Sequence, residues 1–126
     1  MRTREIPYER WSYFFDDFTR LHQGEHVNVE TMDDEASNLE ARLHDLPLVG
    51  IVGAAVRAGS GHWIEVIAGD SPDAETKHCV ARPSRVVVAE EHGQAVALQI
   101  ESADGLVTML RFEPPREAMP QGFTLE

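Results

Sequence analysis

The chain has 126 residues, of which 42% are hydrophobic, and its 22 acidic and 11 basic side chains give a formal net charge of −11. This length suits one globular domain with a core of its own, and the acidic balance disfavours nucleic acids and anionic membrane surfaces as partners. The single cysteine, Cys79, excludes an internal disulfide and a cysteine-rich zinc site. No apolar run approaches the ~18 residues of a membrane span, and the N-terminus has no apolar signal core, so we expect a cytoplasmic protein.

An amphipathic helix with a heavy apolar face is predicted between Pro7, which suits a first helical turn, and Gly24, which suits a helix end. Tyr13 falls on its polar side. His22 falls on its apolar side, and we interpret it as a packed, hydrogen-bonded histidine at the helix C-terminus, with a ligand-binding role as the alternative. At 3.6 residues per turn, six large side chains share the apolar face: Tyr8, Trp11, Phe14, Phe15, Phe18 and Leu21.

Alternating apolar and polar residues, or short apolar runs, predict strands in much of the remaining chain. Gly50 and Gly53 indicate a bend, a bulge or a close backbone approach within one of them. Asp104-Gly105 is the strongest hairpin signal in the chain. The predicted strands are residues 26–32, 48–57, 62–68, 77–82 with a continuation at 85–90 after the interrupting Pro83, 95–101 and 106–112. The inward positions predicted on the last two are Val96, Leu98, Ile100, Leu106, Thr108, Leu110 and Phe112.

A short second helix is predicted for residues 33–46, where Leu39, Leu43 and Leu46 recur at helical spacing and Pro47 ends the pattern. These elements predict an α+β domain of residues 1–113, with its N-terminal helix packed on a bent antiparallel sheet, or a small barrel, of five to six strands. Residues 114–126 form a C-terminal tail, which we expect either to stay flexible or to lie back on an apolar groove.

Several of these pieces, taken in order, resemble a bacterial family known as domain of unknown function 5335. The resemblance runs from Ile6 to Phe112 and implies a small single-domain bacterial protein, with no assigned activity and no catalytic residues to transfer. The matching residues are Ile6-Pro7, Trp11, Phe14 or Phe15, Phe18, His22, Gly24, Leu46-Pro47-Leu48, Gly50-Ile51, His78, Pro83, Leu98 to Ser102, Asp104-Gly105, Thr108 and Leu110-Arg111-Phe112.

The residues that carry chemistry do not form a recognisable catalytic or metal-binding motif. His22 and His26 do not form a metalloprotease pair, because the helix-breaking Gly24 lies between them, and His78 and Cys79 point to opposite faces of a strand. We interpret Cys79 as a small buried hydrophobic residue and not as a nucleophile. The paired carboxylates diverge on adjacent positions, which is typical of solvated faces. No phosphate loop, nucleophile elbow or dinucleotide fingerprint is present, so we expect no cofactor.

Three hypotheses follow. We favour a non-enzymatic interaction or accessory domain whose partner is an unidentified protein or a second copy of the chain, with Tyr13 and Trp63 as the candidate interaction surface. The alternative is a small-ligand or metal-binding domain with a site near His22 and His78, the two polar residues among the apolar ones that match the family. An enzyme of unknown class is the third, and no positive feature of the sequence supports it.

Overall fold

The structure is a computed structural model that describes residues 2–33, 39–55 and 62–114, so the predicted tail lies almost wholly outside the described residues. Among these residues there is one α-helix, α1 (Trp11–His22), which is preceded by the short 3-10 turn η1 (Tyr8–Arg10). A second 3-10 turn, η2, spans Pro72–Ala74. The strands are β1 (Arg2–Ile6), β2 (His26–Met32), β3 (Leu39–Ala55), β4 (His62–Ala68), β5 (Thr76–Ala81), β6 (Pro83–Glu91), β7 (Gln94–Ser102) and β8 (Val107–Phe112).

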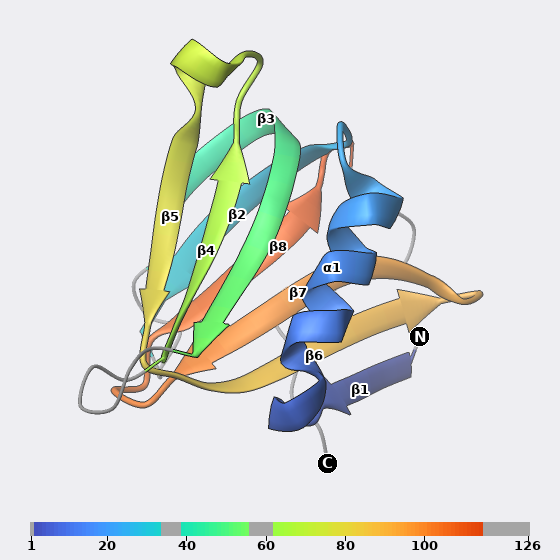
Figure 1. Ribbon diagram of the computed structural model, residues 1–126, viewed down its shortest axis with the longest axis vertical. Helices are drawn as coiled ribbons and strands as arrows, with labels where there is room; N and C mark the ends of the chain where they lie inside the picture. Colours follow the sequence, from blue (N-terminus) through green and yellow to red (C-terminus); the bar gives the residue numbers. More distant parts are fainter. Residues whose placement is uncertain (1, 34–38, 56–61, 115–126) are drawn as a thin grey trace.

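The eight strands form one open antiparallel sheet in the order β1-β6-β7-β8-β2-β3-β4-β5. The predicted α+β class, with an N-terminal helix on an antiparallel sheet, is therefore confirmed. The predicted count of five to six strands and the barrel alternative are wrong, because the sheet has eight strands and ends at the edges β1 and β5. Figure 1 shows how far the sheet bends: β3, β4 and β5 cross in front of β2 and β8, with α1 beside β3 and over β6 and β7.

The long strand β3 makes this bend, because its first half pairs with β2 and its second half with β4. Beyond Pro47, β3 no longer pairs with β2. Helix α1 and the residues after it cover this edge of β3 instead. Leu48 accepts a backbone hydrogen bond from Gly24 at 2.8 Å and donates one to Glu25 at 2.9 Å. Farther along β3, the Ile51 N–H donates to Thr19 Oγ1 at 2.9 Å. Side-chain and loop groups thus replace a strand at this edge and satisfy buried backbone groups.

The apolar face of α1 packs on the concave side of the sheet, as predicted for Trp11, Phe15 and Phe18, which are buried. The prediction is wrong at the margins of the stripe, because Tyr8 and Leu21 are 48% and 67% exposed. The helix lies against β3 at Gly50 and Gly53. The contact therefore involves the centre of the apolar stripe and leaves its margins exposed. A Cβ atom on Gly53 would lie 3.0 Å from the Phe15 ring, so the glycines predicted to mark a bend, bulge or close approach allow a close approach.

The predicted inward positions of the last two strands hold for Leu98, Ile100, Leu110 and Phe112, which join the main core, and for the buried Thr108. Two predictions are wrong. Val96 belongs to a second cluster with Ala89, Ala97 and Met109, because a register shift between Ala89 and Glu90 turns it to the other side of the sheet. Leu106 precedes β8 and is 36% exposed.

The predicted second helix is wrong, because residues 39–46 are the first half of β3, while residues 34–38 lie outside the described part. The helical spacing of the leucines misleads here because irregular pairing shifts the register beside Val29. Asp45 also has a left-handed backbone, with φ of 51°, and its N–H donates to the Asn28 side chain at 2.8 Å. Leu43 and Leu46 therefore both reach the core in a kinked strand, and Leu39 stays exposed.

Strand β1 is an element that the sequence analysis did not predict. Its residues are mostly charged, and only Ile6 is buried. It pairs with β6 at the edge of the sheet, where Arg4 forms an ion pair with Glu90 at 3.3 Å and Glu5 forms one with Arg85 at 3.1 Å. Cross-strand pairing of charge at an edge leaves no hydrophobic periodicity to detect.

Candidate functional site

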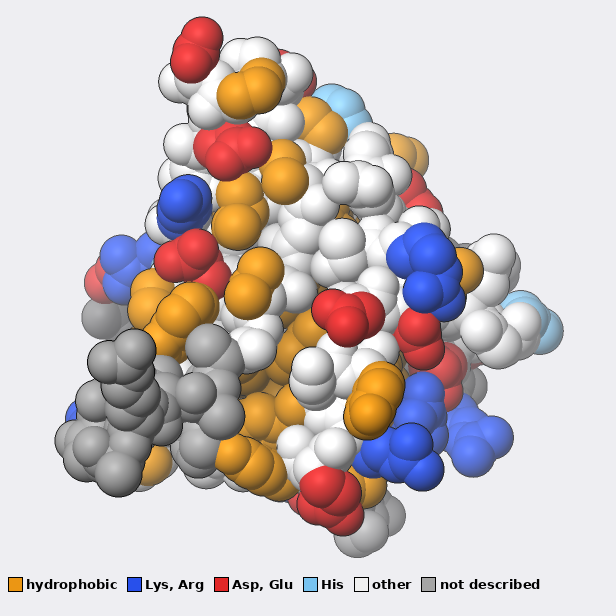
Figure 2. Space-filling model, viewed as in Figure 1, with side chains coloured by type: hydrophobic (Ala, Val, Ile, Leu, Met, Phe, Trp, Pro, Cys, Tyr) orange, Lys and Arg blue, Asp and Glu red, His pale blue; other side chains and the backbone are white. Residues whose placement is uncertain are grey.

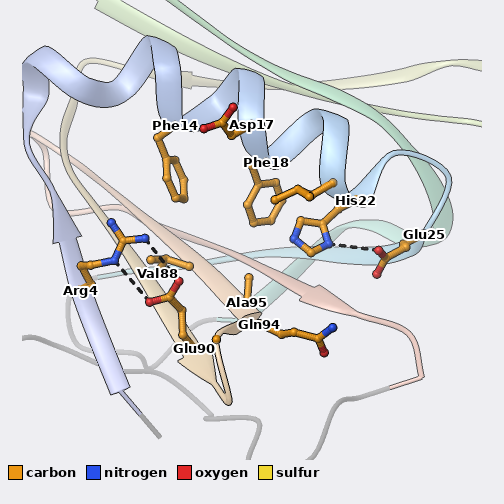
Figure 3. Close-up of a pocket in the computed structure, with 12 residues that line it drawn as sticks. Arg4, Phe14, Asp17, Phe18, His22, Glu25, Val88, Glu90, Gln94 and Ala95 are labelled. Atoms are coloured by element: carbon orange, nitrogen blue, oxygen red, sulfur yellow. Dashed lines mark hydrogen bonds and ion pairs between the residues drawn. The ribbon is translucent and has the colours of Figure 1, made fainter.

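A groove of about 380 Å³ opens between α1 and the strands β1, β6 and β7. Figure 3 shows side chains of the helix on one wall facing side chains of the sheet on the other. The apolar lining is Phe14, Phe18, Leu21, Val88 and Ala95, and the polar lining is Arg4, Asp17, His22, Glu25, Glu90 and Gln94, with Gly93 at the turn between β6 and β7. Concave sites of this kind, mostly apolar with a few placed polar groups, are the usual binding sites for small molecules.

The helix wall of the groove follows from the spacing of its residues. Phe14, Asp17, Phe18, Leu21 and His22 lie three or four positions apart and so share one side of α1. This side overlaps the buried stripe at Phe18 and His22, and it faces β6 and β7 across the groove. Its aromatic rings are in contact, with the Phe14 and Phe18 centroids 5.8 Å apart, which fixes the apolar wall in place.

The sheet wall is fixed by an ion pair and a tight turn. Arg4 on β1 donates two hydrogen bonds to the Glu90 carboxylate on β6, each at 3.3 Å. His92 and Gly93, with φ of 53° and 80°, form the two-residue turn into β7, as expected for a hairpin that needs left-handed backbone. The turn places Gln94 and Ala95 at the floor of the groove (Figure 3).

His22 closes the groove at the C-terminal end of α1. Its Nδ1 lies 3.1 Å from Glu25 Oε2, and its ring packs between Phe18 and Phe112, with centroid distances of 4.6 and 5.1 Å. The residue is only 9% exposed. Figure 3 shows the second ring nitrogen, Nε2, turned toward the groove. His22 is thus both a packed, hydrogen-bonded histidine at the helix end and a lining residue.

The charge of the groove is negative. Three carboxylates and one guanidinium line it, so its formal charge is −2 with His22 neutral. The guanidinium of Arg4 is engaged by Glu90, and Asp17 at the rim pairs with the exposed Arg20 at 2.8 Å. A cationic group entering the groove meets more carboxylate oxygens than positive charges, which favours it electrostatically over an anion.

A second, more open hollow of about 400 Å³ adjoins the groove. It shares Arg4, Phe14 and Asp17 with the groove and extends it toward the start of the helix. Tyr13, one of the two residues predicted for an interaction surface, lines this hollow and is 67% exposed. The remaining residues that line the hollow are Ile6, Pro7 and Arg10.

His78, the other histidine of the predicted site, lies on β5 opposite Val66 and does not line the groove. The structure therefore does not bring His22 and His78 together in one cavity. Burial, together with the positive charge of Arg42, lowers the pKa of His78. Within residues 2–33, 39–55 and 62–114, no three His, Cys, Asp or Glu side chains are grouped closely enough to hold a metal ion.

Trp63, the second residue predicted for an interaction surface, is partly buried on β4, opposite Ala81 of β5. Figure 2 shows hydrophobic side chains over β4 and β5, with acidic and basic side chains between them. Cys79 lies on the same face of these strands as Glu65 and is exposed. The interpretation of Cys79 as a buried hydrophobic residue is therefore wrong, because the edge position of β5 leaves its outer side uncovered.

Sequence reasoning missed most of the groove. Arg4, Glu90 and Gln94 come from three strands, and only the pairing of β1 with β6 and β7 brings them together. Glu25 was within reach of prediction, because it follows His22 by three residues at the end of the helix. No helix among the described residues has the length and hydropathy needed to cross a membrane.

Comparisons with known proteins identify a family but no activity. A family described as "Family of unknown function (DUF5335)" matches residues 2–121, which confirms the resemblance seen in the sequence. An uncharacterised protein of Aquifex aeolicus (strain VF5) is 24% identical over 114 residues, covering 90% of this chain and 95% of that protein. No solved structure matches the chain significantly.

Proposed function

The chain belongs to DUF5335, a family of unknown function, so its role has to be argued from its own groove, and we propose that it is a non-enzymatic domain that binds a small organic cation with an apolar body. The observation that carries this proposal is the composition of the groove, which combines an aromatic wall with an excess of carboxylates.

The apolar part of the ligand would lie on Phe14 and Phe18, with Val88 and Ala95 on the opposite wall. Burying apolar surface contributes roughly 25 cal/mol per Å², and a preformed aromatic wall needs little reorganisation before it binds. Aromatic faces also attract ammonium groups, by about 0.5–1 kcal/mol at an exposed site.

The cationic part of the ligand would lie between the helix and the sheet rim, near Asp17 and Glu25. A role in binding is favoured over one in catalysis by the setting of His22. Its ring is held between two phenylalanines and by Glu25, so it is positioned as a fixed wall with one nitrogen facing the ligand. A bound ammonium group could donate a hydrogen bond to that nitrogen when the imidazole is neutral.

The proposal is tested with three probes of one shape and different charge: 2-phenylethylamine, 2-phenylethanol and phenylacetate. Calorimetric titration should give the tightest binding for the ammonium compound, and about tenfold weaker binding or none for phenylacetate. Equal affinity for all three, or preference for the anion, would contradict the proposal.

A matched pair of variants tests the position of the charge. Asp17→Asn removes a carboxylate from the groove and should weaken ammonium binding about threefold, as expected for one partly exposed charge worth roughly 0.6 kcal/mol. Asp16→Asn, one residue earlier on the helix and exposed, removes a carboxylate that does not line the groove and should leave the affinity unchanged. Equal losses in both variants would indicate a general effect of net charge.

A further inference from the structure

Strand β5 is an edge of the open sheet and, among the described residues, pairs only with β4. An edge strand presents unpaired N–H and C=O groups, which bind another strand unless charge, proline or a covering element prevents it. Thr76, Lys77, Cys79 and Ala81 on this edge are exposed. Lys77 is its only charged residue, and it contains no proline.

The opposite edge, β1, is protected in the way that β5 is not. Three of its five residues are charged, and ion pairs join Arg4 to Glu90 and Glu5 to Arg85 on the neighbouring strand. Charged edges of this type resist pairing with other chains. In the part of the chain that the structure describes, the sheet therefore has one edge protected by charge and one edge that can accept a further strand.

We propose that β5 pairs antiparallel with β5 of a second copy of this chain, with His78 opposite the second copy's His78, so that the two sheets join into one. In this register Thr76 pairs with Val80 and Lys77 with Cys79, in both directions. A two-fold axis perpendicular to the joined sheet relates the copies, so their concave faces lie on the same side.

The outer face of the joined sheet would be complementary in charge. Lys77 and Glu65 form no ion pair with any described residue, and Glu65 lies opposite Cys79 across β4 and β5. In the proposed register Lys77 lies opposite the second copy's Cys79. The second copy's Glu65 lies one strand farther on, in the same line across the strands. Two strand spacings, about 9–10 Å between Cα atoms, are within reach of these two long side chains, and symmetry makes the pair twice.

The inner face gives an independent reason for this register. The Nε2 atom of His78 is buried and has no hydrogen-bond partner among the described residues, and such an orphaned group is costly. Directly opposed residues of antiparallel strands have Cβ atoms about 4.5–5.5 Å apart. Because Nε2 is covered in the single chain, the ring turns toward the edge on pairing, and two neutral imidazoles at that separation then form one hydrogen bond with each other.

A second copy fits the edge better than an unrelated strand, because both copies supply the same complementary row of lysine and glutamate. The net charge of −11 per chain opposes association. Five residue pairs also make a small interface. We therefore expect a weak dimer that exchanges rapidly with the monomer.

Sedimentation velocity of the full chain at physiological salt, over a concentration series reaching the millimolar range, tests the proposal. Lys77→Glu and Glu65→Lys should each raise the dimer dissociation constant about tenfold, and the double swap K77E/E65K should restore it to near the original value. The exposed helix residues Arg20 and Asp16 give controls: Arg20→Glu and Asp16→Lys make the same changes in net charge and should not reproduce the losses.

Hydrogen exchange gives a second readout that needs no substitution. Amides of β5 that face away from β4 should exchange more slowly as the protein concentration rises, while amides of the opposite edge, β1, should not change. A strict monomer over the whole series, a dimer that both single swaps leave unaffected, or a double swap that is no tighter than the singles would each overturn the proposal.

Discussion

Replacing Thr19 with valine should destabilise the protein, because Thr19 joins α1 to the edge of β3 through a single side-chain oxygen. That oxygen accepts the Ile51 N–H at 2.9 Å, and Ile51 is only 3% exposed. Valine has nearly the same shape as threonine and leaves no cavity, so the expected loss is that of one orphaned buried donor, about 1–3 kcal/mol. Threonine, valine and serine have similar helix propensities, which leaves the propensity term small.

Thr19→Ser is the matched control for this prediction. It keeps the oxygen and loses only the methyl group. That methyl packs against Gly50, where an added Cβ atom would lie 3.1 Å from it. The expected cost of that methyl is about 0.8 kcal/mol. Urea unfolding followed by tryptophan fluorescence should rank the stabilities as wild type, then Thr19→Ser, then Thr19→Val.

A loss of about 2 kcal/mol corresponds to a fall of roughly 1 M in the urea midpoint for a domain of this size. The slope of the urea dependence should stay the same, since the substitution barely changes the surface that unfolding exposes. A Thr19→Val protein as stable as Thr19→Ser would refute the view that the helix replaces a strand at this edge.

Three further predictions concern other parts of the fold. Gly69→Ala should cost about 1–3 kcal/mol in thermal unfolding, because the new Cβ would lie 2.5 Å from the Ala74 carbonyl oxygen, which is backbone and cannot turn away; unchanged stability would contradict this packing. Trp11→Phe should cost about 1–3 kcal/mol, because it removes the buried 2.9 Å hydrogen bond from the indole to the Ile6 carbonyl; a loss within experimental error would contradict it. The folded-state pKa of His78 lies below the unfolded value of 6.5, so the unfolded state binds the proton first and stability falls as the pH drops through 6.5 toward the folded pKa. His78→Asn should therefore lose less stability than wild type between about pH 7 and pH 5, and parallel pH profiles would count against it.

The parts of the fold that sequence analysis predicted are those with uninterrupted periodicity. The stripe of α1 repeats every three or four residues from Trp11 to His22, and β2 alternates without a break, so both appear where they were expected. The hairpin between β7 and β8 follows from Asp104-Gly105, whose glycine has φ of 93°. In each case local residues alone determine the conformation.

The errors arise where tertiary pairing decides the structure. The leucines of residues 39–46 fit a helix by spacing, and only the pairing with β2 and the left-handed Asp45 make that segment a strand. Strand β1 has no apolar pattern, because its cross-strand ion pairs with β6 replace one. The barrel alternative depended on closure between distant strands, which no local pattern encodes.

The candidate site was predictable at His22 and at Glu25, which follows it by three residues. The position of His22 on the apolar side of α1 follows from the helical period, and the structure places it at the end of the groove. The sheet wall, formed by Arg4, Glu90 and Gln94, depends on an edge strand that the sequence did not reveal. His78 shares a family pattern with His22, but β5 places it on another part of the sheet, outside the groove.

The most direct test of the proposed function is a titration of ¹⁵N-labelled protein with 2-phenylethylamine, followed by amide chemical shifts. Saturable shifts should concentrate on the helix from Phe14 to His22 and on the turn at Gly93 and Gln94, which face each other across the groove. Strand β5 serves as the internal reference and should not respond. No saturable shifts, or shifts of the same size in β5, would contradict the assignment of this groove as a binding site for organic cations.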